Sequence, residues 1–221
     1  MRANEDTVLV GRACSLVPYR KEHVETYHQW MLSPELQELT ASEPLSLEEE
    51  FAMQVSWRDD KDKLTFIILD HTGPPGAGEP PVPACCSAVC GHAGGAMCGD
   101  VNLFFNDHDD EKTAEIDVMV AVPSSRRKGI AREAVRMMMA YAAADLRTRR
   151  FVAKVKSGNE PSLALFRSLG YAEVRRLDWA DEIHLALPAG DPADTPADGV
   201  LLESVRQTAA EMTRASYSGA G

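Results

Sequence analysis

The chain has 221 residues, 44% of them apolar, and a formal net charge of −11 at pH 7. This size supports one sizeable domain with its own core, so no second domain is required. No apolar run approaches the roughly 20 residues that span a bilayer, and Met1–Asp6 is not followed by an apolar stretch as long as that of a signal peptide. We therefore expect a soluble protein of the cytoplasm or the nucleus, not a membrane or secreted protein.

The first half of the chain predicts strands and helices in the order β, α, α, followed by an antiparallel meander. Two signals support the helices: Ser46 and Glu49 match a capping box, and Ser33-Pro34 interrupts the first helical region. The expected elements are a first strand or bent strand over residues 8–10 and 13–19, helices over 21–32 and 47–57, and strands over 64–70 and 100–105.

A Gly/Pro/Cys-rich insertion, at about residues 71–98, is expected to be flexible. Paired Cys-x-x-Cys knuckles, typical of structural zinc sites, are absent from it, so we expect free thiols and no metal site. The cysteines and histidine concerned are Cys85, Cys86, Cys90, Cys98 and His92. The main domain is expected to cover residues 1–187, followed by a partly disordered tail, 188–221, with a possible short helix at 200–213.

The segment from Glu115 to Arg132 is the most informative part of the sequence. Residues 115–122 are rich in β-branched side chains, Pro123 ends that strand, and a helical pattern begins at Ile130. The first N–H groups of a helix have no acceptor within the helix and therefore favour an anion such as a phosphate. A basic turn in an acidic chain predicts a specific anionic ligand, not a nucleic-acid surface.

Other phosphate-binding loops are excluded by their patterns. The chain contains neither Gly-x-x-x-x-Gly-Lys-Ser/Thr nor Gly-x-Gly-x-x-Gly. In the basic turn, Gly129 has no β-carbon and Ala131 a minimal one, so the backbone can adopt unusual turn dihedrals and approach a phosphate closely.

Residues 150–156 predict another strand, followed by a short helix between Asn159 and Gly170. Pro161 suits the first helical turn, and Gly170 suits the left-handed position that ends a helix. Asn159 has two interpretations: it caps the helix, or its amide holds a ligand or an ordered water. A hairpin over residues 171–178 and 181–187 completes the expected fold.

Two motifs resemble those of the GNAT N-acetyltransferases. Arg126 to Ala131 fits Arg/Gln-x-x-Gly-x-Gly/Ala, the acetyl-coenzyme A loop of that family, and Asn159 to Tyr171 is similar to its second motif, Asn-x-x-Ala/Ser-x-x-Leu-Tyr-x-x-x-Gly-Phe. The resemblance implies an α/β (α+β) fold, in which helices flank a mixed, mostly antiparallel sheet that splays at the coenzyme A site. It also implies acetyl-coenzyme A as co-substrate, bound by Met119, Val120, Ala121, Arg126, Arg127, Lys128, Gly129, Ile130, Ala131, Arg132, Asn159 and Phe166.

Residues 39–45, 100–104 and 115–119 resemble the N-acetyltransferase 9-like subgroup, and the likeness extends from about the first strand to Leu187. That resemblance implies a protein amino terminus as acceptor, with tubulin the target proposed for the subgroup. Two alternatives remain open. One is a small-amine acetyltransferase, and the other is a weakly catalytic module with the same fold that binds a partner such as the microtubule.

Acetyl transfer also requires that a proton leave the amine. Glu115 and Asp117 lie on one side of the expected strand, and both are candidates to take the proton through a water; of the two we favour Glu115. Where related enzymes carry a Tyr that protonates the departing thiolate, this chain has Phe166, so the thiol, with a pKa near 8.5, would leave as the thiolate. An α-amino group, with a pKa near 8, needs less help from a base than a lysine does, which favours amino termini.

Overall fold

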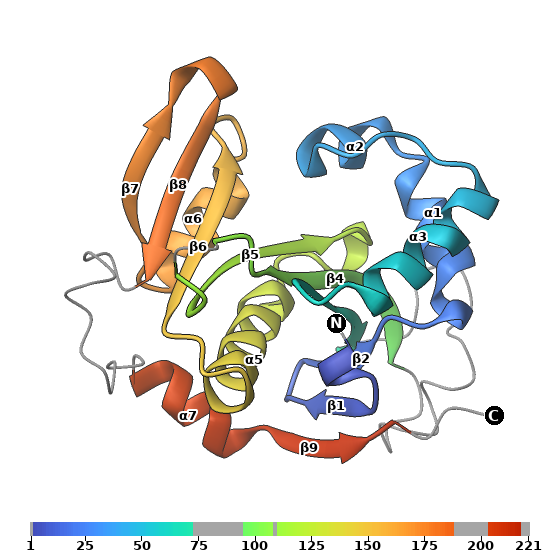
Figure 1. Ribbon diagram of the computed structural model, residues 1–221, viewed down its shortest axis with the longest axis horizontal. Helices are drawn as coiled ribbons and strands as arrows, with labels where there is room; N and C mark the ends of the chain where they lie inside the picture. Colours follow the sequence, from blue (N-terminus) through green and yellow to red (C-terminus); the bar gives the residue numbers. More distant parts are fainter. Residues whose placement is uncertain (1, 73–94, 108–109, 188–202, 218–221) are drawn as a thin grey trace. The chain divides into compact units, whose positions relative to one another are not determined.

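Figure 1 shows the computed structural model, which describes residues 2–72, 95–107, 110–187 and 203–217. Within these ranges nine strands form one mixed sheet in the order β7-β8-β6-β5-β4-β3-β2-β1-β9, flanked by helices, as the α/β expectation required. Contacts divide the chain into two compact units. Unit 1 comprises Met1–Asn102, Val118–Ala134 and Met212–Gly221, and unit 2 comprises Leu103–Asp117 and Val135–Glu211.

The sheet of unit 1 begins with β1 (Thr7–Val10) and β2 (Cys14–Pro18), which pair antiparallel with Leu9 opposite Leu16. The expectation of a single bent strand is therefore wrong in one respect, because the Gly11 N–H donates to the Cys14 carbonyl and closes a hairpin. The hairpin continues antiparallel through β2 to β3 (Lys63–Asp70), whose residues are all buried. These three strands are neighbours in the part of the sheet that belongs to unit 1.

Three helices belong to unit 1 and lie together in Figure 1: α1 (Val24–Met31), α2 (Pro34–Thr40) and α3 (Leu47–Asp59). The predicted capping box of α3 is confirmed, because Ser46 and Glu49 each accept a hydrogen bond from the other's backbone N–H. The sequence analysis missed α2. Ser33 caps it with its side chain and Pro34 occupies its first turn, so the Ser33-Pro34 pair starts a helix as well as ending one.

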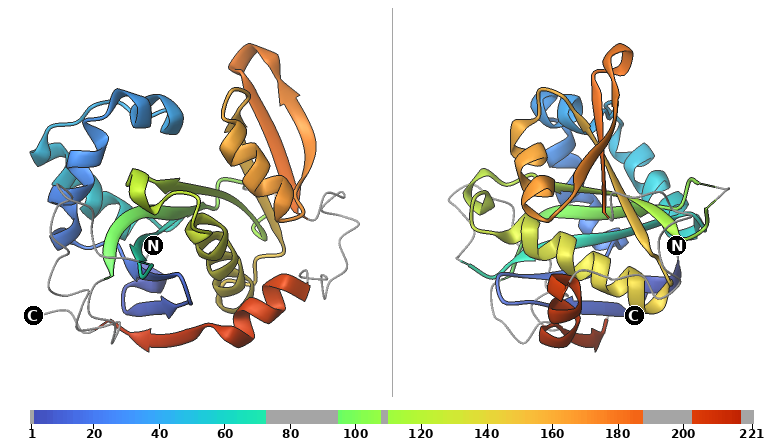
Figure 2. Two further views of the ribbon diagram at one scale, coloured as in Figure 1. Left: turned by 180° about the vertical axis from the view of Figure 1, so that it is seen from behind. Right: turned by 90° about the vertical axis from the view of Figure 1, so that its left-hand side faces the viewer.

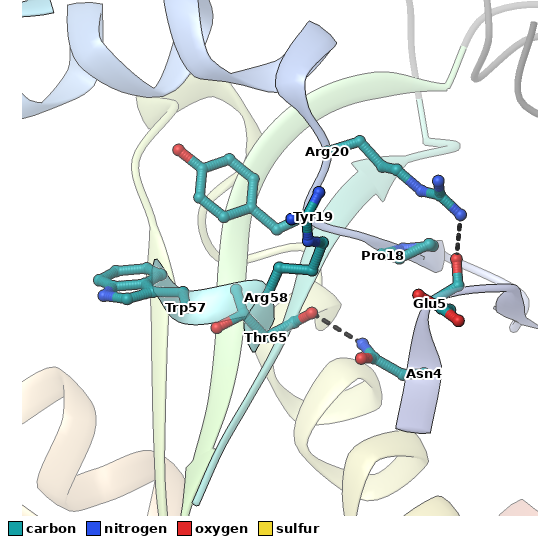
Figure 3. Close-up of a pocket in the computed structure, with 8 residues that line it drawn as sticks. All are labelled: Asn4, Glu5, Pro18, Tyr19, Arg20, Trp57, Arg58 and Thr65. Atoms are coloured by element: carbon teal, nitrogen blue, oxygen red, sulfur yellow. Dashed lines mark hydrogen bonds between the residues drawn. The ribbon is translucent and has the colours of Figure 1, made fainter. Parts of the chain in front are cut away.

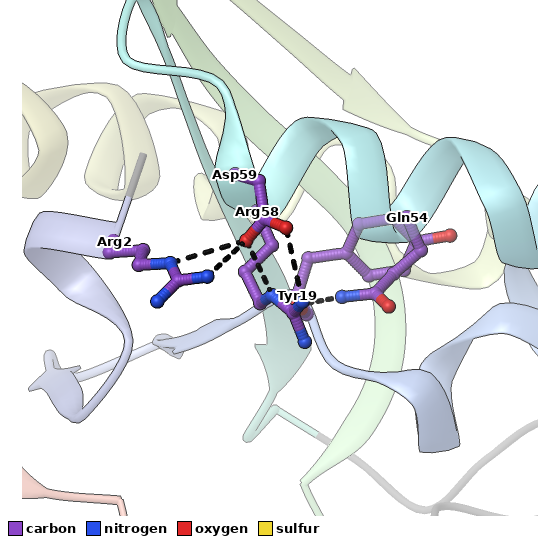
Figure 4. Close-up of polar contacts among 5 residues, drawn as sticks. All are labelled: Arg2, Tyr19, Gln54, Arg58 and Asp59. Carbon is purple, nitrogen blue, oxygen red and sulfur yellow. Dashed lines mark hydrogen bonds and ion pairs between the residues drawn. The ribbon is translucent and has the colours of Figure 1, made fainter.

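The amino-terminal turn, Arg2–Asn4, is tied to the end of α3. Asp59 accepts hydrogen bonds from Arg2 and Arg58, while Gln54 donates to the Tyr19 carbonyl (Figure 4). These bonds fix the beginning of the chain to the helical side of unit 1. The carboxylate of Asp59 is fully exposed, so we attribute little stability to it.

Unit 1 also contains the end of the described chain. Strand β9 (Thr213–Ser216) pairs antiparallel with β1, beside which it runs in Figure 2. The Tyr217 ring lies 4.9 Å from the Arg20 guanidinium, and its hydroxyl donates to Glu22. The tail helix expected at 200–213 is found as α7 (Glu203–Glu211), in unit 2, but the strand after it was not predicted.

Unit 2 contains β6 (Arg150–Lys156), α6 (Glu160–Ser168), and the hairpin of β7 (Ala172–Leu177) and β8 (Glu182–Leu187). Figure 2 shows α6 beside β6 and the hairpin. Strand β5 (Thr113–Val120) pairs parallel with β6 from Thr113 to Glu115, and their common register ends there although both strands continue.

Strand β4 (Ala96–Phe104) starts earlier than predicted, so the insertion reaches less far than residue 98. Cys98 is buried in this strand and carries a free thiol, as does buried Cys14. Cys85, Cys86 and Cys90, for which free thiols were expected, and His92 lie outside the described residues. Across the part of the chain that the structure describes, no helix is long and apolar enough to cross a membrane.

Candidate active site

The end of β5 is held against β4 by an irregular pairing. The N–H groups of Ala121 and Val122 both donate to the Cys98 carbonyl, at 2.9 and 3.2 Å, so two residues of one strand face a single residue of the other. A β-carbon on Gly99 would lie 1.9 Å from the Met119 carbonyl oxygen, which leaves room only for glycine. The bulge therefore fixes the direction of the backbone groups at Met119 to Ala121.

The basic turn links this strand to helix α5 (Ile130–Asp145). Arg127 and Gly129 have φ angles of 62° and 84°, in the left-handed region. No other atom lies within 4 Å of the position that a Gly129 β-carbon would take, so the backbone conformation, and not crowding by the protein, requires glycine. The Glu133 N–H donates to the Gly129 carbonyl, which leaves the N–H groups of Ile130, Ala131 and Arg132 without an acceptor inside the helix.

Two of the four basic side chains of the turn bind protein groups. The Arg126 guanidinium donates to the carbonyls of Val120 and Ala121, at 3.0 and 3.4 Å, and lies 3.6 Å from Glu35 of α2. The Lys128 ammonium lies 3.6 Å from Asp70. Arg127 and Arg132 are exposed. The four cations therefore do not contribute equally to the expected attraction for phosphate. It depends mainly on the backbone N–H groups and on the side chains of Arg127 and Arg132.

Asp70, at the end of β3, contacts the turn through Ser125 and Lys128. It is 4% exposed and accepts hydrogen bonds at 2.6 Å from the Ser125 hydroxyl and from both the N–H and the hydroxyl of Thr72. Burial favours the neutral carboxyl, but the bonds from Ser125 and Thr72 and the charge of Lys128 outweigh it and hold the pKa of Asp70 below its usual value. Asp70 therefore stays ionised beside the basic turn.

Glu133, in the first turn of α5, binds the turn between β1 and β2. Its carboxylate accepts the backbone N–H groups of Arg12, Ala13 and Cys14 at 2.9, 2.7 and 2.9 Å. A β-carbon on Gly11 would lie 2.7 Å from the Glu133 carboxyl carbon. Glu133 thus joins the start of the helix to the hairpin.

The two acids proposed for proton transfer lie on β5, in unit 2. Glu115 is half-buried and its carboxylate lies 2.5 Å from the Lys154 ammonium, whereas Asp117 is exposed. Strand alternation puts both side chains on one side, as expected. Lys154 is therefore the ionic partner of the acid expected to act as base, a contact the sequence analysis did not anticipate.

The second motif has mainly structural contacts in unit 2. The Asn159 side chain accepts the Ser162 N–H at 3.2 Å, which confirms that it caps α6. Phe166 is 2% exposed and packs edge-on against Tyr171, with ring centroids 5.1 Å apart, so its ring belongs to the core. The Tyr171 hydroxyl donates to the Met139 sulfur. Coenzyme contacts by Asn159 and Phe166 stay predictions.

A network of buried polar side chains surrounds strand β4 in unit 1. The Asp100 carboxylate accepts hydrogen bonds from Asn102 and Tyr27, at 2.9 and 3.3 Å, and Asn102 accepts one from Thr65 at 2.6 Å. Burial raises the pKa of Asp100. Since these polar groups bind one another, we interpret their hydrogen-bond network as support for strand β4.

A small pocket in unit 1, drawn in Figure 3, is lined by no residue of the basic turn. Tyr19, Arg20, Trp57 and Thr65 are among the residues that line it. Its volume is about 30 Å³, roughly the share of one water molecule in the liquid. This pocket cannot hold a coenzyme. Among the described residues no group of three or more His, Cys, Asp or Glu side chains is placed to bind a metal ion.

Comparison with known proteins decides the family. Residues 14–172 match the family model of the acetyltransferase (GNAT) domain. The chain belongs to the GNAT acetyltransferase family. It is 45% identical over 195 residues to human alpha/beta-tubulin-N-acetyltransferase 9, covering 86% of this chain and 87% of that protein. It is 42% identical over 198 residues to an N-acetyltransferase 9-like protein of Nematostella vectensis, covering 90% and 94%.

Solved structures confirm the GNAT fold. Spermidine N-acetyltransferase from Vibrio cholerae, in complex with CoA and spermine, matches with a TM-score of 0.62 over 79% of this chain and 94% of that chain, at 15% identity. The family match and the relatives at 42–45% identity identify the chain as an N-acetyltransferase. The sequence analysis found the turn and α5 of this acetyltransferase but missed Asp70 and Glu133, which lie outside the motif. The Asp-x-Thr of a strand end, typical of an Asx-turn, was the one signal for Asp70.

Proposed function

We propose that this GNAT protein transfers the acetyl group of acetyl-coenzyme A to the α-amino group of a protein. The observation that carries the proposal is the start of α5. Three consecutive N–H groups, at Ile130 to Arg132, have no acceptor inside the helix. The left-handed backbone angles of Arg127 and Gly129 form the turn that leads into this helix start. Such a turn suits the pyrophosphate of coenzyme A.

The remaining part of the coenzyme fits the end of β5. The backbone of Met119, Val120 and Ala121 is held in place by the bulge opposite Cys98. We assign these groups to the pantetheine arm, and a backbone N–H near Met119 or Val120 to the thioester oxygen as negative charge develops on it. Holding amine and thioester in attack geometry is worth roughly 7 to 11 kcal/mol in favourable cases.

Proton transfer is assigned to Glu115 acting through a water. Its carboxylate lies 2.5 Å from the Lys154 ammonium, a contact that holds the side chain in place on β5. The coenzyme leaves as the thiolate, because Phe166 has no proton to give and the hydroxyl of buried Tyr171 is bonded to Met139. The amine attacks directly, in a complex that contains both substrates.

The acceptor class follows from charge and from the relatives. Residues 22–57, which contain α1, α2 and all but the last two residues of α3, include eight Glu and no Lys or Arg, so this part of unit 1 attracts cations. The human relative is named an alpha/beta-tubulin N-acetyltransferase. We therefore propose a protein amino terminus, with α- or β-tubulin as the first candidate.

A direct test incubates the enzyme with labelled acetyl-coenzyme A and amino-terminal peptides of tubulin. Mass spectrometry should find label on the α-amino group and none on lysine side chains. Peptides with blocked amino termini are the control. Absence of label from every peptide with a free amino terminus would contradict the proposal.

The same acidic segment favours one second candidate, a small polyamine. The fold alone allows it, because the Vibrio cholerae neighbour is named a spermidine N-acetyltransferase. A panel of free amines, run beside the peptides, separates the two. Turnover limited to the free amines would replace the protein acceptor by a polyamine.

A further inference from the structure

The start of α5 is attached to the β1–β2 turn by several bonds. Three backbone N–H groups, from Arg12 to Cys14, converge on the Glu133 carboxylate within 2.9 Å, and the Cys14 thiol lies 3.8 Å from the Ile130 carbonyl oxygen. Bonds from N–H groups to a carboxylate are stronger than bonds between neutral groups. Cys14 itself is 0% exposed, and burial, followed by the charge of Glu133, raises the pKa of its thiol. The attachment is therefore strong, and its Cys14 end is buried.

The other end of the basic turn has a comparable attachment. Buried Ser125 ends the short turn Pro123–Ser125, and its hydroxyl donates to Asp70 at 2.6 Å. The same carboxylate lies near Lys128. Asp70 therefore holds the entry to the turn, whereas Glu133 holds its exit into α5.

We propose that Glu133 and Asp70, with the β1–β2 turn as a support, are positioning residues for the coenzyme-binding turn. They fix the direction of the N–H groups at Ile130 to Arg132 without touching the coenzyme. This role rests on the proposed function, since it concerns the same site.

The expected effect follows from conformational populations. Arg127 and Gly129 adopt left-handed backbone angles, which for Arg127 are held only by the surrounding structure. Loss of an attachment lowers the fraction of molecules whose N–H groups converge, and the apparent Kd rises by the inverse of that fraction. Removing one attachment should weaken coenzyme binding about tenfold, while the acceptor KM stays unchanged.

Calorimetry with coenzyme A tests the role on the full chain. Glu133→Gln keeps the size of the side chain but removes its charge and replaces one of the two acceptor oxygens by an N–H₂ group, which cannot accept from the N–H that faces it. Ser125→Ala removes the bond to Asp70. Gly11→Ala perturbs the same contact from the hairpin side, because its β-carbon would press on the Glu133 carboxylate. All three variants should raise the Kd about tenfold, with kcat at saturation changed less than threefold.

A double variant separates positioning from general weakening. Glu133→Ala removes the group that Gly11→Ala displaces, so adding Gly11→Ala to it should cost little further affinity. Asp59→Asn is the matched control: it also removes a carboxylate with several hydrogen bonds, but its partners are Arg2 and Arg58. It should leave the Kd unchanged. If Glu133→Gln fails to fold, Gly11→Ala and Ser125→Ala decide.

Two results would overturn the role. One is a Kd within twofold of wild type in Glu133→Gln and Gly11→Ala, even if their Tm falls, since that would leave only a structural contribution. The other is full additivity of Gly11→Ala and Glu133→Ala. Absence of any heat with the wild-type protein would instead contradict the proposed function itself.

Discussion

The turn before α5 and the second motif in unit 2 differ in what their residues do. In the turn, backbone N–H groups carry the predicted chemistry, and protein groups such as Asp70 and Glu133 hold the backbone in place. In the second motif, the side chains expected to meet the coenzyme have protein partners: Asn159 caps a helix and Phe166 packs on Tyr171. One region presents main chain, and the other uses its side chains for stability.

This difference shows which functional roles a short sequence motif can predict. A main-chain anion site needs only small residues and a helix start at fixed spacing, so a short pattern specifies most of it. A side-chain role depends on partners from distant parts of the sequence. The four predictions that follow challenge this distinction, beginning with the largest expected effect.

Replacing the turn glycine should abolish coenzyme binding. Gly129 has a φ of 84°, and a β-branched side chain there is strongly strained. We expect Gly129→Val to weaken coenzyme A binding more than about 100-fold, as measured by calorimetry, because the strain of a few kcal/mol is relieved by reorienting the N–H groups. Gly158→Val, at a glycine with open space and no positive φ, is the control and should bind normally. Equal losses in both variants would contradict a backbone-specific role.

Acid should destabilise unit 1 through His23. Burial lowers the pKa of His23 from 6.5 to about 4, and its Nδ1 accepts the Arg20 N–H, which requires the neutral ring. Because the unfolded chain takes up the proton more readily, stability is complete above pH 6.5 and falls as the pH drops toward 4, by up to roughly 3 kcal/mol. Denaturant unfolding at several pH values should show this slope.

The variant His23→Gln should lose most of that slope, since it has no ring to protonate. His184→Gln, which changes a histidine of unit 2, is the control. It tests whether replacing any histidine removes the pH dependence of the stability. If the slope persists unchanged in His23→Gln, another group is responsible. Loss of coenzyme binding along the same pH range would show that the turn depends on the fold of unit 1 around it.

Removing the proposed base should cost less than disturbing the turn. We expect Glu115→Gln to lower kcat about tenfold at neutral pH. This is less than the roughly 100-fold or more that a positioned base usually contributes, because an α-amino group is already partly neutral. Asp117→Asn, on the same side of β5 but exposed, should change kcat less than twofold and serves as the control. A larger effect from Asp117 than from Glu115 would reverse their assignment.

Much of the fold could be predicted because its signals are local. The Ser46–Glu49 box, the strand that ends before Pro123 and the left-handed Gly170 each specify an element from a few neighbouring residues. Strand β9 could not be predicted, because only its pairing with β1, which lies at the other end of the chain, makes Thr213–Ser216 a strand. Helix α2 was missed because Ser33-Pro34 was interpreted only as a stop.

The candidate site divides in the same way. The sequence indicated the residues of the turn, but Glu133 and Asp70 are recognisable only once β1, β2 and β3 are in place around them. The Lys154 partner of Glu115 lies on a strand that follows a long helix, so no spacing rule connects the two. Long-range ion pairs and hydrogen bonds are the part that local patterns cannot specify.

Restoring the phenol of the second motif should have the smallest effect on rate. Phe166 is 2% exposed and its ring packs on Tyr171, so a hydroxyl added by Phe166→Tyr enters the core. Burying a hydroxyl without a partner costs about 1 to 3 kcal/mol, which should appear as a lower Tm, while kcat changes less than twofold. Leu163→Ile, a core change in the same helix, controls for altered packing. A clear rise in kcat would mean that position 166 reaches the departing thiolate, and that the second motif does contribute a side chain to the chemistry.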